Sequence, residues 1–227
     1  MATDAAALHR LLAWLSPSFP VGAFTFSHGL ERAIDAHLVT DAPSAEAWLA
    51  ALILQGSGQA DLTLVAAGWD ATTDTALASA AATGVAYAAT RELYLETTAQ
   101  GAAFVAAIGA AWPSAAQARL DALLGTTDAV PYPVALGHVA ADQHISRDAT
   151  LHAYAHAFVA NLISAIVRAV PLGQSDGQRI LAGLEPVLIE AVDRAAETPL
   201  TQLVAYTPMS DICSMQHEVQ YTRLFRS

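Results

Sequence analysis

The sequence contains no lysine and little positive charge of any kind. All ten basic residues are arginine, against 21 aspartate and glutamate residues, so the formal net charge is −11. Nucleic-acid binding depends on clustered basic side chains that neutralise phosphates. The arginines form no stripe along the chain, and the overall field repels polyanions. We therefore expect no nucleic-acid partner and no binding to an anionic membrane surface.

Cysteine and long apolar runs are also scarce. Cys213 is the single cysteine, which excludes a disulfide framework within the chain. The most apolar run, residues 157–167, has about half the roughly twenty residues that a membrane-spanning helix needs. The first residues lack the cationic start and extended apolar core of a secretory signal. These features predict a cytoplasmic protein without a membrane partner.

The common catalytic and nucleotide-binding motifs are missing. Gly56-Ser57-Gly58 lacks the lysine that completes a phosphate-binding loop. Neither the Gly-x-Gly-x-x-Gly pattern nor the Gly-x-Ser-x-Gly nucleophile elbow occurs. The sequence therefore predicts a protein that is not an enzyme, and no catalytic residue is proposed.

Alanine and leucine dominate what is present, and 54% of the residues are hydrophobic. Both lose little side-chain entropy in a helix. Apolar periodicity and proline punctuation predict helices throughout, for example over 73–87 and 91–111. Pro186 should kink or split the helical pattern around it. Since connections are short and no repeat or linker is visible, we expect an all-α protein, residues 1–227 forming a single compact domain of about ten helices.

Two residue pairs have a spacing that could serve a metal ion. His152 and His156 are four residues apart, and so are Cys213 and His217, so each pair shares a helix face. Imidazole and thiolate suit nickel or zinc, but two ligands make only half a site. Solvated histidines and a partly buried thiol explain the same spacing. We predict no metal site and keep a metal-binding helical enzyme using these residues as the alternative, beside a helical module that binds an unrelated protein.

Two segments have unusual compositions, residues 24–32 and the tail, about residues 210–227. In the first, Ser27 could cap a helix, Gly29 suggests close approach of another backbone, and Glu31 suits the helix dipole. The tail ends in Arg-Leu-Phe-Arg-Ser, residue types that often dominate interfaces. From the residues alone, the tail is either docked on its own domain or bound by a partner.

These two segments resemble the UreF family of urease accessory proteins. Residues 16–31 are similar to the family's Ser-Pro-x-x-Pro-x-Gly-x-Phe-x-Tyr-Ser-x-Gly-Leu-Glu signature. The tail matches at 214–215, 217–218, 220–221 and 223–227, and residues 170–178 supply a third match between them. Phe26 replaces the usual tyrosine, Gln216 stands where arginine is frequent, and Cys213 stands where a small residue is common.

The resemblance implies an all-α fold that forms a homodimer and a chaperone role in nickel insertion. It implies a scaffold that bridges the accessory protein UreD (also called UreH) and the GTPase UreG, that modulates the GTPase, and that acts on apo-urease. Nickel would be handled by the complex, with no cofactor held tightly by this chain. The residues that it marks for partner binding are Phe24, Ser27, Gly29, Leu30, Glu31, His217, Glu218, Tyr221, Arg223, Leu224, Phe225, Arg226 and Ser227.

Overall fold

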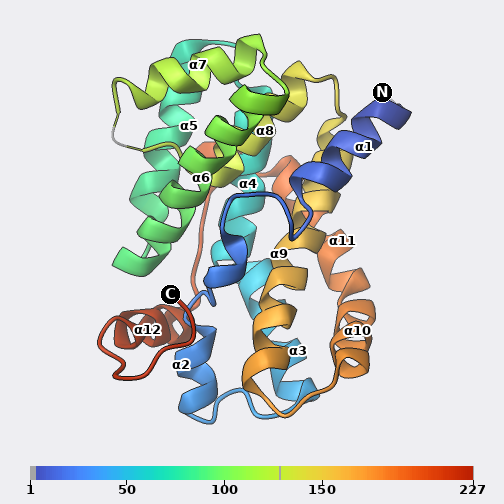
Figure 1. Ribbon diagram of the computed structural model, residues 1–227, viewed down its shortest axis with the longest axis vertical. Coiled ribbons are helices and arrows are strands. Elements are labelled where there is room, and N and C mark those ends of the chain that lie inside the picture. The colour runs from blue at the N-terminus through green and yellow to red at the C-terminus, as the bar shows by residue number, and fades with distance from the viewer. Residues whose placement is uncertain (1–3, 128, 227) are drawn as a thin grey trace.

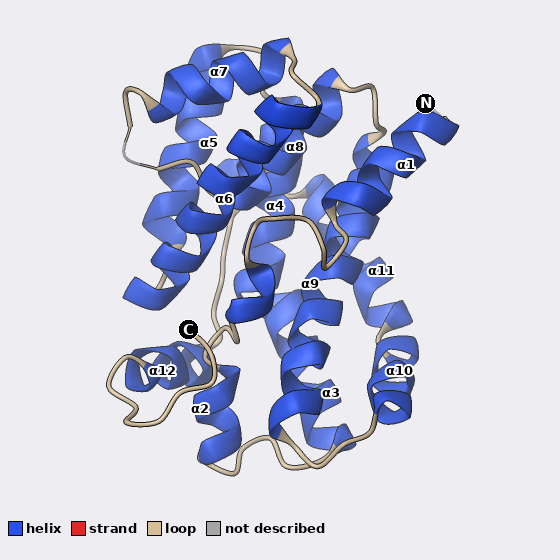
Figure 2. Ribbon diagram, viewed as in Figure 1, coloured by secondary structure: helices blue, strands red, loops and turns tan. Residues whose placement is uncertain are grey.

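Helices make up every regular element in the described part of the computed structural model, residues 4–127 and 129–226 (Figures 1 and 2). The all-α prediction is confirmed, with twelve α-helices in these ranges where about ten were expected. In chain order, the α-helices and two short 3-10 helices (η) are α1 Ala5–Trp14, η1 Ala23–Thr25, α2 Leu30–Asp35, α3 Ala42–Gln55, α4 Ser57–Asp70, α5 Asp74–Tyr87, α6 Arg91–Ala111, α7 Ala115–Leu124, α8 Tyr132–Asp142, α9 Arg147–Ala169, α10 Gln174–Gly183, α11 Glu185–Glu197, η2 Leu200–Gln202 and α12 Pro208–His217.

Several helix boundaries follow from capping residues and proline. Asp41 caps α3 by accepting a hydrogen bond from the backbone N–H of Ser44, and the Ser44 hydroxyl bonds back to the cap residue. Pro186 divides the predicted pattern as expected, because α10 ends at Gly183 and α11 begins at Glu185. Proline is tolerated there since the first helical N–H groups have no partner within the helix.

The caps of α9 and α2 set where these helices start. The cap of α9 is Ser146, which accepts from the Ala149 N–H. Ser27 was expected as a helix cap, but the cap of α2 is Gly29. His28 and Gly29 both have left-handed backbones, with φ of 60° and 75°, which delays the start of α2.

Helices α4 and α8 form the centre of the fold. Residues 132–140 of α8 are all buried, as expected for a helix surrounded by others. The two helices touch through backbone at Gly137, where an added Cβ would lie 2.1 Å from the Val65 carbonyl oxygen. A side chain at this position would force the two central helices apart, so glycine is required by the packing.

Two stretches are long and apolar enough to cross a membrane by length and composition alone, Ala42–Asp70 and Arg147–Ala169. The fold buries 67% and 50% of their most apolar windows, so much of each stretch packs inside the protein. The most apolar run considered in the sequence, residues 157–167, is shorter than either of these stretches.

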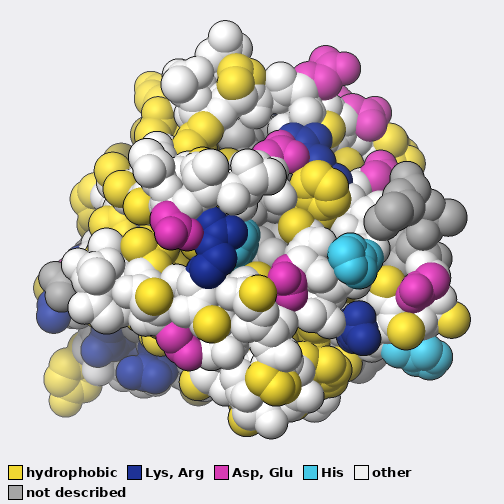
Figure 3. All heavy atoms as spheres, turned by 90° about the horizontal axis from the view of Figure 1, so that it is seen from above, with side chains coloured by type: hydrophobic (Ala, Val, Ile, Leu, Met, Phe, Trp, Pro, Cys, Tyr) yellow, Lys and Arg dark blue, Asp and Glu magenta, His cyan; other side chains and the backbone are white. Residues whose placement is uncertain are grey.

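The surface carries mixed charge. On the face drawn in Figure 3, arginine side chains lie in separate small groups among acidic and apolar ones, without a continuous basic stripe. This distribution gives a polyanion no extended surface to follow on that face.

Candidate functional site

The two segments that the sequence marked as unusual lie side by side in the fold. Helix α12 and the chain that follows it pack against α2, and the C-terminus lies beside both (Figure 1). The Arg226 N–H donates a hydrogen bond to the Thr25 carbonyl oxygen at 2.7 Å. Residues about 200 positions apart in sequence therefore form one surface, which we call the tail site.

Gly29 allows the two helices to meet. Its φ of 75° disfavours any side chain, and an added Cβ would lie 2.8 Å from the backbone nitrogen of Ser214 in α12. The close backbone approach expected at Gly29 is thus present, and the approaching backbone belongs to this chain.

Glu31 holds the tail in place. Its carboxylate accepts hydrogen bonds from the backbone N–H groups of Leu224, at 2.7 Å, and Phe225, at 3.0 Å. The side chain of Phe225 is buried, and Glu31 itself is only 8% exposed. Because a carboxylate that accepts backbone N–H bonds makes charge-assisted contacts, Glu31 is a strong anchor for the tail.

A second carboxylate, Glu92 of α6, completes a buried ionic cluster around His217. The imidazole is fully buried, with Nε2 3.1 Å from Glu31 and Nδ1 2.9 Å from Glu92. Both ring nitrogens can donate only if the ring is cationic. Arg223 also contacts Glu92, at 3.3 Å. Two acidic side chains, Glu31 and Glu92, thus meet two basic ones, His217 and Arg223, in this cluster.

Opposing effects act on the pKa of the Glu92 carboxyl. Burial raises the pKa of its carboxyl, while the hydrogen bond and charge of His217 and the charge of Arg223 lower it, and the net result is a raised value. The position of Glu92 in the cluster was not predicted, because in the sequence it is an ordinary acidic residue in the first turn of a helix.

Arg168 of α9 joins the tail to the segment before α2. Its guanidinium lies 3.7 Å from the ring centroid of Phe24 and 4.4 Å from that of Phe225. It also donates a hydrogen bond to the Phe24 carbonyl oxygen at 3.1 Å. Stacking of a guanidinium between two aromatic rings adds a cation–π attraction to each contact. Sequence reasoning missed this arginine, since nothing in the spacing relates α9 to the tail.

The outward side of α12 is apolar. Met209, Ile212 and Met215 follow one another at helical spacing and are each about half exposed, and Val219 continues the line at 85% exposed. Tyr221 in the loop beyond is fully exposed. Together these five residues form a surface that we call the α12 face. Clustered exposed apolar side chains mark protein–protein contact sites.

The residues marked for partner binding divide into an inner and an outer group. The buried ones serve the fold and the docking of the tail: Ser27, Gly29, Leu30, Glu31, His217 and Phe225. Phe24, Tyr221, Arg223, Leu224 and Arg226 are exposed, Glu218 is half-buried, and Ser227 lies outside the described residues.

The two residue pairs considered for metal binding lie on different helices, His152 and His156 on α9 and Cys213 and His217 on α12. His217 is enclosed by its two carboxylates, while His152 lies on α9 with a 3.7 Å contact to Asp148. Burial raises the pKa of the Cys213 thiol, which disfavours the thiolate that a metal would need. Over residues 4–127 and 129–226, no three His, Cys, Asp or Glu side chains are grouped so that they could hold an ion.

The fold and the tail site define a class of protein: an all-helical protein that presents an apolar helix face beside a tail docked on its own surface. Comparison with known proteins identifies the family to which the chain belongs. The UreF family model matches residues 39–185. The chain belongs to the UreF family of urease accessory proteins, which are chaperone-type proteins and not catalytic enzymes.

Its similarity to individual relatives extends over the full length. The chain is 49% identical to the urease accessory protein UreF of Rhodopseudomonas palustris strain BisB5, over 100% of this chain and 93% of the relative. It is 43% identical to the protein of the same name from Bradyrhizobium sp. strain ORS 278, over 99% of this chain and 93% of the relative. The two segments that form the tail site, residues 24–32 and about 210–227, lie outside the range of the family model but inside the alignment with the Rhodopseudomonas palustris protein.

Proposed function

We propose that this chain, acting as a single cytoplasmic domain, is a scaffold that joins UreD (UreH) to the GTPase UreG during delivery of nickel to apo-urease. Membership of a urease accessory family supports the general role. The observation that carries the specific proposal is the α12 face, where apolar side chains stay exposed directly beside a tail fixed by Glu31 and His217.

The docked tail fits a scaffold because it fixes the shape of the surface before a partner arrives. Ordering flexible residues during association reduces affinity, and a pre-ordered segment avoids that loss. The inner group of residues thereby supports the outer group, Phe24, Tyr221, Arg223, Leu224 and Arg226. The chain would form a homodimer through another part of its surface. It would modulate UreG by binding one nucleotide state of UreG better than another.

Deleting residues 223–227 should weaken complex formation with UreD and UreG by roughly ten-fold or more, because it removes exposed contact residues and the Phe225 anchor together. A pull-down with the purified partners measures this loss. Leu8→Ser, on the half-exposed side of α1, is the matched control and should bind like wild type. Undiminished complex formation by a folded truncated chain would remove the tail from the proposal.

A further inference from the structure

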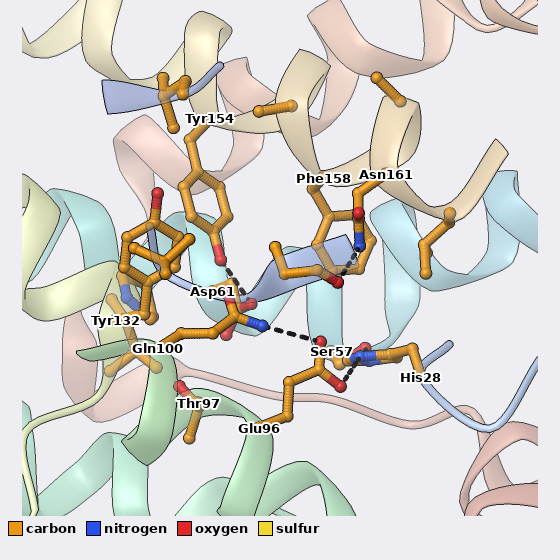
Figure 4. A pocket seen from close by; sticks show the side chains of 18 of the residues that line it. His28, Ser57, Asp61, Glu96, Thr97, Gln100, Tyr132, Tyr154, Phe158 and Asn161 are labelled. Carbon is orange, nitrogen blue, oxygen red and sulfur yellow. Dashed lines mark hydrogen bonds and ion pairs between the residues drawn. The ribbon is translucent and has the colours of Figure 1, made fainter. Parts of the chain in front are cut away.

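A cavity of about 330 Å³ lies between α4, α6, α9 and the connector that leads from α1 to η1 (Figure 4). The connector and the start of η1 form one wall of it, from Leu15 to Phe24. None of the described tail residues lines the cavity, and neither Glu31 nor Glu92 of the ionic cluster does. The cavity and the tail site are therefore separate, and only the chain around η1 lies between them.

The first half of this wall is anchored in the core. The ring of Phe19 lies 5.7 Å from that of Phe104 in α6 and 6.3 Å from that of Trp112, measured between ring centroids. Aromatic pairs at such distances attract each other beyond the effect of burial alone. This half of the connector is fixed without any help from the tail.

The second half, around η1, has weaker contacts of its own. The backbone N–H groups of Thr25 and Phe26 donate to Gly22 and Ala23 within the same segment. Asn161 of α9, which points to this wall in Figure 4, donates to the Ala23 carbonyl oxygen at 3.2 Å. At Gly22, an added Cβ would meet no described atom within 4 Å, so the turn that leads into η1 is loosely packed on that side.

The tail supplies direct contacts to this second half. The Arg226 N–H donates to the Thr25 carbonyl oxygen at 2.7 Å, directly after the lining residue Phe24. The guanidinium of Arg226 lies 5.8 Å from the ring centroid of Phe26, within the range of a cation–π contact. One tail residue thus holds two successive residues at the end of the cavity wall.

Arg168 supplies an indirect contact. Its guanidinium lies between the rings of Phe24, which lines the cavity, and Phe225, which anchors the tail, and it also bonds the Phe24 carbonyl oxygen. Arg168 itself does not line the cavity. Without Phe225 the guanidinium would lose its stacking partner on one side, so the position of Phe24 depends on the docked tail.

We propose that docking of the tail and the shape of the cavity are coupled. The docked tail holds η1 in place as part of the cavity wall, and release of the tail lets η1 move away and opens the cavity. The ionic cluster around His217 would thereby control access to a cavity that it does not touch. A protein that binds the released tail better than the docked one would shift the chain toward the open form. This coupling goes beyond the scaffold proposal and does not depend on it.

A buried thiol in the cavity wall can report the opening in the isolated full-length chain. Ala60 lines the cavity and is 5% exposed, so Ala60→Cys is combined with Cys213→Ala, which removes the single native thiol. The rate of modification by N-ethylmaleimide is followed by mass spectrometry. Phe225→Ala and, separately, Arg168→Met should each raise this rate by about ten-fold or more, because local opening becomes more frequent. Since neither residue lines the cavity, the effect must pass through η1.

A second reporter separates local opening from general loss of stability. Ala116→Cys in the same background places the thiol on α7, where Ala116 is 2% exposed and lies outside the cavity. The two tail variants should change its modification rate by less than about two-fold, because distant sites act independently.

Two results would overturn the coupling. One is a rate at the cavity thiol that stays within about two-fold of its starting value in either variant. The other is an equal acceleration at both thiols, which would mean that the variants loosen the whole fold. Because the measurement needs neither UreD nor UreG, its failure would leave the scaffold proposal standing, and loss of the scaffold proposal would leave the coupling standing.

Discussion

Replacing His217 with alanine should lower the free energy of unfolding by about 3–5 kcal/mol and release the tail. The imidazole of His217 lies between two buried carboxylates, Glu31 and Glu92. Without it, the two carboxylates would remain buried with only Arg223 to compensate, and removal of one member of a buried ionic cluster is among the most destabilising of substitutions. Urea denaturation measures the loss.

Release of the tail can be followed separately by limited trypsin digestion. Since the chain has no lysine, trypsin cleaves only after arginine, and Arg223 is the first site beyond α12. Cleavage there should be much faster in His217→Ala than in wild type. His152→Ala is the matched control, because its side chain is 41% exposed and its contact with the Asp148 carboxylate is long, at 3.7 Å. A change below about 1 kcal/mol in His217→Ala would show that the cluster does not hold the tail.

Asp61→Asn should stabilise the protein at pH 7, by up to about 3 kcal/mol. The folded-state pKa of Asp61 is about 6, against an ordinary value of 3.8. Between these pH values the folded protein keeps a proton that the unfolded chain has lost, so the free energy of unfolding falls as pH rises from about 4 to about 6 and stays reduced above it. Asparagine does not ionise, and its amide oxygen can still accept the bond from Tyr154.

Thermal and urea denaturation of wild type and Asp61→Asn between pH 4 and 7.5 tests this expectation. The difference in stability should be near zero at the acid end and grow to its full value above pH 6. Asp74→Asn, an exposed carboxylate, should show no such growth. A variant that is less stable than wild type at pH 7, or a difference that does not change with pH, would contradict the burial of an ionised Asp61. A carboxyl retained at the expense of stability is itself a sign of function.

Local sequence signals were sufficient for most of the helices. The bounds of α5 and α6 follow from Thr73 and Thr90, whose side chains accept from backbone N–H groups three residues later. Pro186 located the division between α10 and α11 in the same way. Such signals act over three or four residues, so they can be recognised without knowing the tertiary structure.

The tail site could be predicted only in part, because its bonds connect distant residues. The sequence indicated Glu31 and His217 as unusual, yet 186 positions separate them, and no periodicity relates them to Glu92. The sequence alone did not decide whether the tail docks on its own domain or is bound by a partner. In the structure, Phe225 is docked while Tyr221 and Leu224 remain exposed, so docking holds for part of the tail and partner binding by its exposed side chains stays a prediction.

Recognition of the partner proteins by the α12 face is tested most directly by complex formation with a variant of that face alone. Met215→Asp places a charge on the exposed side of α12 without removing any buried contact of the tail. Size-exclusion chromatography with light scattering, on a mixture with UreD and UreG, should show loss of the complex for Met215→Asp. Ile189→Asp, equally exposed on α11, should still form it. A complex that forms with both variants at wild-type strength would contradict the account.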